Sequence, residues 1–133
     1  MKPGALTLFF PQFLPGTHGP YGAIERLARV GSWTNERGSE AVTWSPGMYD
    51  IVGYPTNDAL SKSEARRGIH PDDRAASEQA SQDAISGTKP FDTQFRILLP
   101  DGSVRHLKAA AHVVRDATGT ALRMIGVNTD VTD

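Results

Sequence analysis

The sequence predicts a single α+β domain in which a five-stranded antiparallel sheet has helices packed on one face and an N-terminal helix flanking the sheet. Three observations lead to this fold class. Apolar and polar residues alternate near the beginning of the chain and over its last third, as in strands that face a core on one side. Signals for helix starts and ends lie between these two regions. The length of 133 residues suits one domain.

The first 30 residues are expected to form an irregular arm and a short amphipathic helix. Prolines and glycines interrupt residues 1–20, yet LTLFF at residues 6–10 is too apolar for a free tail, so the arm should pack on this domain or on a partner chain. From residue 21 to residue 30, the spacing of apolar side chains predicts a helix that ends at Gly31. We expect its apolar stripe to form the interface of a homodimer. The stripe consists of Tyr21, Ile24, Leu27 and Ala28.

Residues 32–53 are expected to form a hairpin followed by a short helix. SWTNE and AVTWS are aromatic and β-branched runs separated by RGSE, a pattern typical of two strands joined by a turn. Ser45 followed by Pro46 is a signal for a helix start, and Gly53 ends the helix. The two tryptophans, Trp33 and Trp44, are expected to pack in the core.

The stretch HPDDR, from His70 to Arg74, could be half of a metal site, an acid–base pair or a helix start. Pro71 has no N–H to lose at the first position of a helix. Asp72 and Asp73 then lie in the first turn, where each carboxylate stabilises the helix by about 0.3–1 kcal/mol. Neighbouring residues in a helical turn point in different directions, so these side chains do not converge on a substrate. We therefore interpret HPDDR as the start of a helix that ends near Gly87.

The last third of the chain predicts three consecutive strands. FDTQFRILLP at 91–100 and VRHLKAAAHVVRD at 104–116 alternate and are separated by a tight turn at Gly102. ALRMIGVNTDVT at 121–132 is apolar on both faces from Leu122 to Val127. A strand with two apolar faces needs a cover on its outer side, and we expect the helix at 21–30 and the N-terminal arm to supply it.

Composition excludes several functional classes. The net charge of −1 and the scattered basic residues predict no nucleic-acid partner. No apolar stretch is long enough to span a bilayer, so direct membrane insertion is not expected, and we predict a cytoplasmic location. The chain has no cysteine, which excludes disulfides, thiolate metal sites, cysteine nucleophiles and cysteine-linked chromophores.

Six fragments of the chain together resemble a PAS domain with a C-terminal PAC motif. The resemblance covers residues 31–132, so we assign 1–30 to the arm and flanking helix and 31–133 to the PAS/PAC domain. In the fragment PDGSVRH at 100–106, an aromatic residue commonly follows the arginine, whereas this chain has His106. The fragments are GSW at 31–33, TWSPGMYDIVGY at 43–54, IHPDDR at 69–74, FDTQFRI at 91–97, PDGSVRH at 100–106 and GVNTDVT at 126–132.

The resemblance implies a sensory and dimerisation module of a bacterial signalling protein. Asp130, Val131 and Thr132 resemble the junction at which the sheet of such domains passes its signal to a following helix. We therefore expect an excised part of a sensor histidine kinase, forming a homodimer with an output domain downstream. The input domain of a diguanylate cyclase is the alternative.

A small ligand could bind between the sheet and the helices, because pockets of this kind are mostly apolar with a few polar groups. Two alternatives remain open: a filled core in a ligand-free interaction and dimerisation module, and a small enzyme that uses His70 with Asp72 or Asp73. We predict neither a catalytic residue nor a metal ligand. The expected pocket residues are Ile51, Tyr54, Ile85, Phe95, Ile97, Leu107, Ala109 and Ala111.

No cofactor is firmly predicted. A flavin photoadduct requires a cysteine, which the chain lacks. Haem would need a histidine ligand, and the positions of the four histidines disfavour it. One lies in the glycine- and proline-rich arm, one precedes the long helix, and two share a strand face that points away from the pocket. They are His18, His70, His106 and His112.

Overall fold

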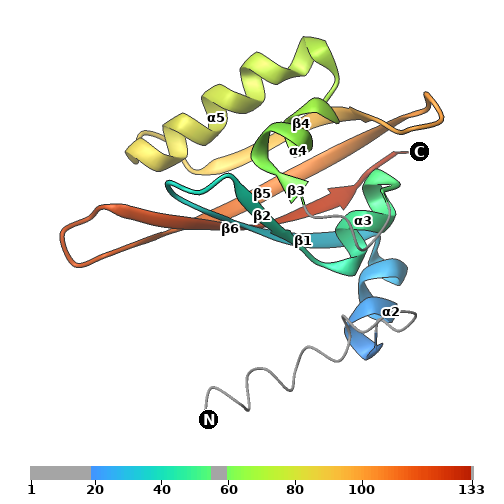
Figure 1. Cartoon of the computed structure of the whole chain (residues 1–133), viewed down its shortest axis with the longest axis horizontal. Helices are drawn as coiled ribbons and strands as arrows, with labels where there is room; N and C mark the ends of the chain where they lie inside the picture. The colour runs from blue at the N-terminus through green and yellow to red at the C-terminus, as the bar shows by residue number, and fades with distance from the viewer. Residues whose placement is uncertain (1–18, 55–59, 133) are drawn as a thin grey trace.

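A computed structural model describes residues 19–54 and 60–132. These residues form an antiparallel sheet with the strand order β3-β2-β1-β6-β5-β4. Helices α4 and α5 lie over one face of this sheet, and α2 lies away from them beside α3 (Figure 1). The helices are α2 (Gly19–Ala28), α3 (Pro46–Val52), α4 (Lys62–Arg67) and α5 (Arg74–Ser86), with a 3-10 turn at Pro71–Asp73; the strands are β1 (Val30–Glu36), β2 (Ala41–Trp44), β3 (Leu60–Ser61), β4 (Phe91–Leu98), β5 (Val104–Arg115) and β6 (Ala121–Asp130).

The predicted α+β architecture is confirmed, with a sixth strand added to the sheet. The additional strand is β3, which extends the edge of the sheet by pairing Leu60 with Val42 and Ser61 with Ala41. Two residues are too few to produce a recognisable alternation of apolar and polar side chains, so sequence patterns could not reveal this strand.

The two strands from opposite ends of the domain, β1 and β6, lie side by side in the middle of the sheet. Trp33 of β1 faces Trp44 of β2 and Gly126 of β6. A Cβ atom on Gly126 would overlap the indole ring of Trp33, so glycine at this position lets the ring lie close to the backbone of β6. The same register places Ala109 of β5 opposite Asn128.

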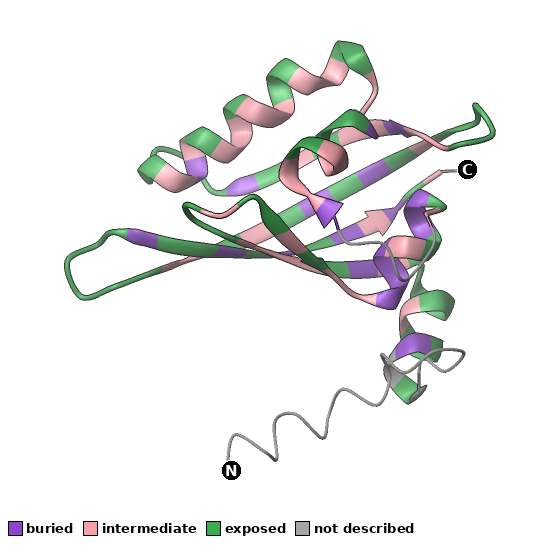
Figure 2. Ribbon diagram, viewed as in Figure 1, coloured by how far each residue is buried: buried purple, intermediate pink, exposed green. Residues whose placement is uncertain are grey.

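The core lies between the sheet and the helices and consists of two clusters. Buried and exposed residues alternate along β5 and β6, as expected for strands with one buried face (Figure 2). Leu107, only 1% exposed, lies at the centre of the first cluster, and Phe91 belongs to the second. The buried members of the two clusters are Met48, Ile51, Val52, Ile97 and Leu107, and Ala84, Phe91, Ala109 and Met124.

The prediction that the N-terminal helix covers the outer face of β6 is wrong. Helix α2 contacts α3 and β1, and Leu122, Ile125 and Val127 of β6 remain 41–43% exposed. Helix α2 packs at α3 because of two hydrogen bonds. The Glu25 carboxylate accepts from the Ser45 hydroxyl (2.8 Å) and from the Gly47 amide (2.9 Å), which holds α2 at the start of α3. The N-terminal arm, the other expected cover, lies outside the described residues.

The helix also ends earlier than predicted. It ends at Ala28, and Arg29 adopts the left-handed conformation with a φ of 59° before β1 begins at Val30. Gly31, expected to end the helix, instead lies in β1 beneath Met48, where a Cβ atom would overlap the backbone of α3. This glycine is therefore needed for the close approach of α3 to the sheet.

Candidate ligand-binding cavity

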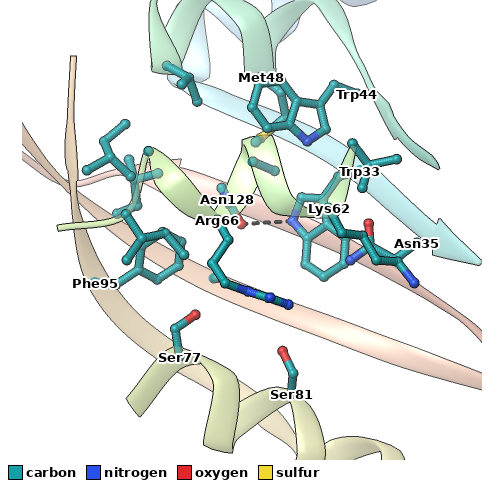
Figure 3. Close-up of a pocket in the computed structure, with 18 of the residues that line it drawn as sticks. Trp33, Asn35, Trp44, Met48, Lys62, Arg66, Ser77, Ser81, Phe95 and Asn128 are labelled. Carbon is teal, nitrogen blue, oxygen red and sulfur yellow. Dashed lines mark hydrogen bonds between the residues drawn. The ribbon is translucent and has the colours of Figure 1, made fainter. Parts of the chain in front are cut away.

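A cavity of about 160 Å³ lies between the sheet and helices α3, α4 and α5 (Figure 3). A cavity of about 150 Å³ can hold one benzene molecule, so this cavity has room for several waters or for a ligand with one six-membered ring. Its floor is apolar and its rim is polar. The residues that line it are Trp33, Asn35, Val42, Trp44, Met48, Val52, Lys62, Ala65, Arg66, Gly68, Ile69, Arg74, Ser77, Glu78, Ser81, Phe91, Phe95, Ile97, Leu107, Ala109 and Asn128.

The floor is built from aromatic rings and small side chains on the strands. Trp33 and Phe91 meet edge to face, with their ring centroids 6.1 Å apart. Phe95 of β4 lies opposite Leu107 of β5, and both line the cavity. Ala109, 1% exposed, leaves space where a larger side chain would fill the core.

The most informative floor residue is Asn128 on β6, which is 6% exposed. Its side-chain oxygen accepts a hydrogen bond of 2.9 Å from the indole N–H of Trp33 (Figure 3). An indole N–H only donates, so the amide oxygen must face it. The NH₂ group of Asn128 then has no acceptor within the described part of the chain. A buried donor without a partner costs about 1–3 kcal/mol, which favours a ligand or water acceptor in the cavity.

The rim carries charges that α4 and α5 bring together. Arg66 of α4 forms an ion pair of 2.9 Å with Glu78 of α5, and both side chains are about half exposed. Lys62 donates to the Glu36 carbonyl at 2.8 Å, and Arg74 donates to backbone carbonyls at 2.9 and 3.0 Å. Three cations and one anion thus line the described rim.

Helix α4 holds its charged residues in place through a capping box. The Ser61 hydroxyl accepts from the Glu64 amide, and the Glu64 carboxylate accepts from the Ser61 amide, both at 3.0 Å. The helix therefore begins directly after β3, at the edge of the sheet. Lys62 and Arg66 are four residues apart and lie on the same side of α4, at the cavity. The sequence S-x-x-E at 61–64 is the signal that could have revealed this helix.

The HPDDR segment starts a helix, as predicted, through a 3-10 turn that precedes α5. The ring of His70 accepts a hydrogen bond of 3.1 Å from the Asp72 amide. The Asp73 carboxylate accepts three hydrogen bonds of 2.7–3.0 Å from the backbone and guanidinium of Arg96 on β4. These bonds hold the pKa of Asp73 well below its usual value. The side chains of His70 and Asp72 lie 4.0 Å apart, but the Asp73 carboxylate is bound to Arg96, so the three do not converge on one point.

Four of the eight residues expected in the pocket line the cavity: Phe95, Ile97, Leu107 and Ala109. The other four lie elsewhere. Ile51 is buried in the first core cluster beneath α3, and Tyr54 stacks on Trp44 with ring centroids 6.0 Å apart. Ile85 and Ala111 pack against the second cluster, where Ala84 and Phe91 fill the space between α5 and the sheet.

Residues that sequence reasoning missed make up most of the rim, and both tryptophans, expected to pack in the core, line the cavity. The described histidines His70, His106 and His112 are not among the lining residues, and His18 lies outside the described residues. Among the described residues, no group of three or more histidine, aspartate or glutamate side chains could hold a metal ion.

The end of β6 is held by polar contacts on both sides. The buried Asp130 carboxylate forms an ion pair of 3.1 Å with Arg29 and accepts from the Thr132 amide at 2.9 Å. Burial by itself raises the pKa of Asp130, but the hydrogen bonds from Thr132 and the charge of Arg29 outweigh it, and the pKa lies below its usual value. The Val131 amide donates to the His106 carbonyl at 2.9 Å. The three residues expected to transfer a signal are thus fixed to β5 and to the end of α2.

The apolar stripe expected at a dimer interface is turned outward. Ile24 is 59% exposed and Leu27 is 85% exposed, and Ala28 is exposed as well. The side chain of Tyr21 lies outside the described residues. Figure 2 shows most of α2 as exposed. In the described residues, none of the helices has both the length and the apolar character needed to cross a membrane.

Comparison with known proteins identifies the fold. The model of a family described as "PAS fold" matches residues 41–128. A solved structure of a sensory box histidine kinase/response regulator from Burkholderia thailandensis is 26% identical, with a TM-score of 0.71 and 85% of each chain covered. The N-terminal domain of a diguanylate cyclase with PAS/PAC sensor from Marinobacter aquaeolei has the same fold at 22% identity and a TM-score of 0.69, covering 77% of this chain and 95% of that one.

Two curated proteins are similar in sequence. The "Probable diguanylate cyclase DgcE" of Escherichia coli is 28% identical over 104 residues, or 78% of this chain. The "Sensor protein FixL" of Bradyrhizobium diazoefficiens is 26% identical over 102 residues, or 77% of this chain. The chain spans only 9% and 20% of the length of these two relatives. Because the family model covers most of the sheet and all the helices around the cavity, the chain belongs to the PAS family of sensory domains.

Proposed function

We propose that this PAS domain is a ligand receiver in which the cavity takes up the signal and the end of β6 passes it to an output domain. One observation carries the proposal. Asn128, buried in the cavity floor, has an amide NH₂ with no acceptor among the described residues, and it lies on β6 two residues before Asp130. A ligand atom that accepts from this amide therefore acts on the same strand that ends at the exit.

The physical route runs along β6 and its neighbours. Asn128 pairs with Ala109, and Asp130 pairs with Leu107, and both of these β5 residues form the cavity floor. If the floor has two arrangements and a ligand binds one of them more tightly, the ligand increases the population of that arrangement. This change in the floor would reach Val131 and Thr132 through their hydrogen bonds to His106 and Asp130.

The output domain is part of the proposal. A sensor histidine kinase is our first candidate, supported by the likeness to the Burkholderia sensory box protein, and a diguanylate cyclase is the second, supported by the likeness to the Escherichia coli relative. The domain itself would perform no catalysis, which is supported by the binding of the Asp73 carboxylate to Arg96 and of the His70 ring to the Asp72 amide. Its location in the cytoplasm is also part of the proposal.

We further propose that the domain forms a homodimer through the outward face of α2. An 85% exposed leucine and a 59% exposed isoleucine on one short helix are costly to leave in water, and a second copy of the same helix could cover them. The ion pair between Arg29 and Asp130 would then connect the dimer interface to the end of β6.

A cavity-filling substitution tests the receiver role. Ala109→Leu places extra carbon atoms in the cavity and acts on the floor as a bound ligand would, while Ala110→Leu, one residue further on the exposed face, is the matched control. The amides of Asp130, Val131 and Thr132 all donate hydrogen bonds, so their hydrogen exchange can be measured. We expect Ala109→Leu to change their exchange rates and Ala110→Leu to leave them unchanged. Equal rates in both variants would contradict the proposal.

A further inference from the structure

We propose that the cavity binds a small aromatic carboxylate, an inference that rests on the proposed receiver function and names its ligand class. The ring would lie against Trp33 and Phe95, and the carboxylate would bind Arg66 at the rim. A polar atom on the ring would accept a hydrogen bond from Asn128. Each part follows from a separate feature of the cavity.

The size and the floor of the cavity select the ring. A cavity of about 150 Å³ can hold benzene, so a volume of about 160 Å³ suits one aromatic ring whose charged substituent reaches the rim. Four aromatic side chains border this space, and two of them, Trp33 and Phe91, already meet edge to face at 6.1 Å. Aromatic rings prefer such edge-to-face and offset contacts, so the floor offers more to a planar ring than to a flexible chain of the same size.

The cations at the rim favour a negatively charged group on the ligand. Arg74 is held by two backbone carbonyls and Lys62 by the Glu36 carbonyl, which leaves Arg66 as the cation of the described rim that is not bound to the backbone. Glu78 lies 2.9 Å from one nitrogen of the Arg66 guanidinium, which carries five N–H donors in all. A guanidinium can hold a carboxylate through two parallel hydrogen bonds, so one ligand carboxylate matches the remaining donors.

Two hydroxyls complete the rim. Ser77 and Ser81 point from α5 toward the cavity and toward Arg66 (Figure 3). Neither hydroxyl has a hydrogen-bond partner within residues 19–54 and 60–132, so both can donate to the carboxylate. At the opposite side, the NH₂ group of Asn128 requires an acceptor, which a ring hydroxyl or carbonyl oxygen supplies.

Calorimetric titration of the 133-residue chain with 4-hydroxyphenylacetate tests the assignment. The matched probes are 4-hydroxyphenylacetamide, which lacks the charge, and 4-hydroxycyclohexylacetate, which keeps the hydroxyl and the charge but lacks the aromatic ring. We expect the first compound to bind at least tenfold more tightly than either. Arg66→Gln should remove the advantage of the acid over the amide, and Glu78→Gln should tighten acid binding because it frees Arg66. Arg67→Gln, on the same helix but outside the cavity lining, is the control and should change neither affinity.

The outcomes separate this inference from the proposed function. Equal affinities for the acid and the amide, or an Arg66→Gln variant that binds the acid as well as the original chain, would overturn the carboxylate. Binding of 4-hydroxycyclohexylacetate as tight as that of the aromatic acid would overturn the aromatic ring. If none of the three probes binds while Ala109→Leu still alters exchange at residues 130–132, the ligand class is wrong and the receiver role stands. If Ala109→Leu also has no effect, both fail; Ala109→Val replaces it if the leucine variant does not fold.

Discussion

The hydrogen bond between Trp33 and Asn128 should be measurable as a coupling free energy. Trp33→Phe removes the indole N–H and leaves the amide oxygen of a residue that is 6% exposed without its partner. This costs about 1–3 kcal/mol of unfolding free energy, in addition to the loss of packing from the smaller ring. Asn128→Leu has a similar shape and leaves the partly buried indole N–H unpaired, at about 1 kcal/mol.

The double variant Trp33→Phe/Asn128→Leu removes both partners at once, so neither is left unpaired. We therefore expect it to be less destabilised than the sum of the single variants by about 1–2 kcal/mol. Urea denaturation followed by circular dichroism gives the three free energies. If the single effects add to within about 0.5 kcal/mol, the two side chains are not coupled. The orientation of the Asn128 amide, from which its free NH₂ group was inferred, would then be wrong.

Three further predictions follow from the packing, the charges and the exposed helix. Gly126→Ala should lower the unfolding free energy by about 1–3 kcal/mol, because the new methyl group overlaps the ring of Trp33; an unchanged denaturation midpoint would contradict the close approach. The pKa of Asp73 is lower in the folded chain, so its stabilising contribution is present above about pH 4 and is lost as the pH falls below it. Asp73→Asn should therefore reduce the loss of stability on acidification, and an unaltered acid transition would refute this. Leu27→Glu should halve the mass in sedimentation, whereas Val104→Glu, an exposed apolar residue on a strand, should not; a monomer before substitution would exclude the dimer.

The strands that sequence patterns predicted are those in which burial alternates over many residues. In β5, Leu107 and Ala109 are buried and their neighbours are exposed, so the apolar residues of the sequence mark the inner face. β3 has only two residues and owes its place in the sheet to pairing with β2, a long-range contact that no local pattern records.

The prediction that the helix covers the outer face of β6 was wrong because apolar periodicity does not say against which surface a helix packs. In α2 the residue that decides this is the polar Glu25, which binds the start of α3. The stripe containing Ile24 and Leu27 is consequently exposed. A carboxylate in the middle of an amphipathic helix was the available sign, but its partner, the Gly47 amide, lies 22 residues further along the chain.

The cavity could be predicted in its floor but not in its rim. Phe95, Ile97, Leu107 and Ala109 lie on alternating positions of two adjacent strands, so their common face follows from the period of a strand. Arg66 and Glu78 come together only because α4 and α5 lie over the same face of the sheet. The role of Asn128 could not be predicted either, because only the structure shows that this polar strand residue is buried.

A crystal structure at a resolution that distinguishes ordered waters and ligands around Asn128 tests the account most directly. We predict a ligand or water atom within hydrogen-bond distance of the Asn128 NH₂ group, inside an open cavity, with the amide oxygen still bound to Trp33. A closed cavity in which a protein oxygen accepts from that NH₂ group would contradict the receiver role and the ligand class together.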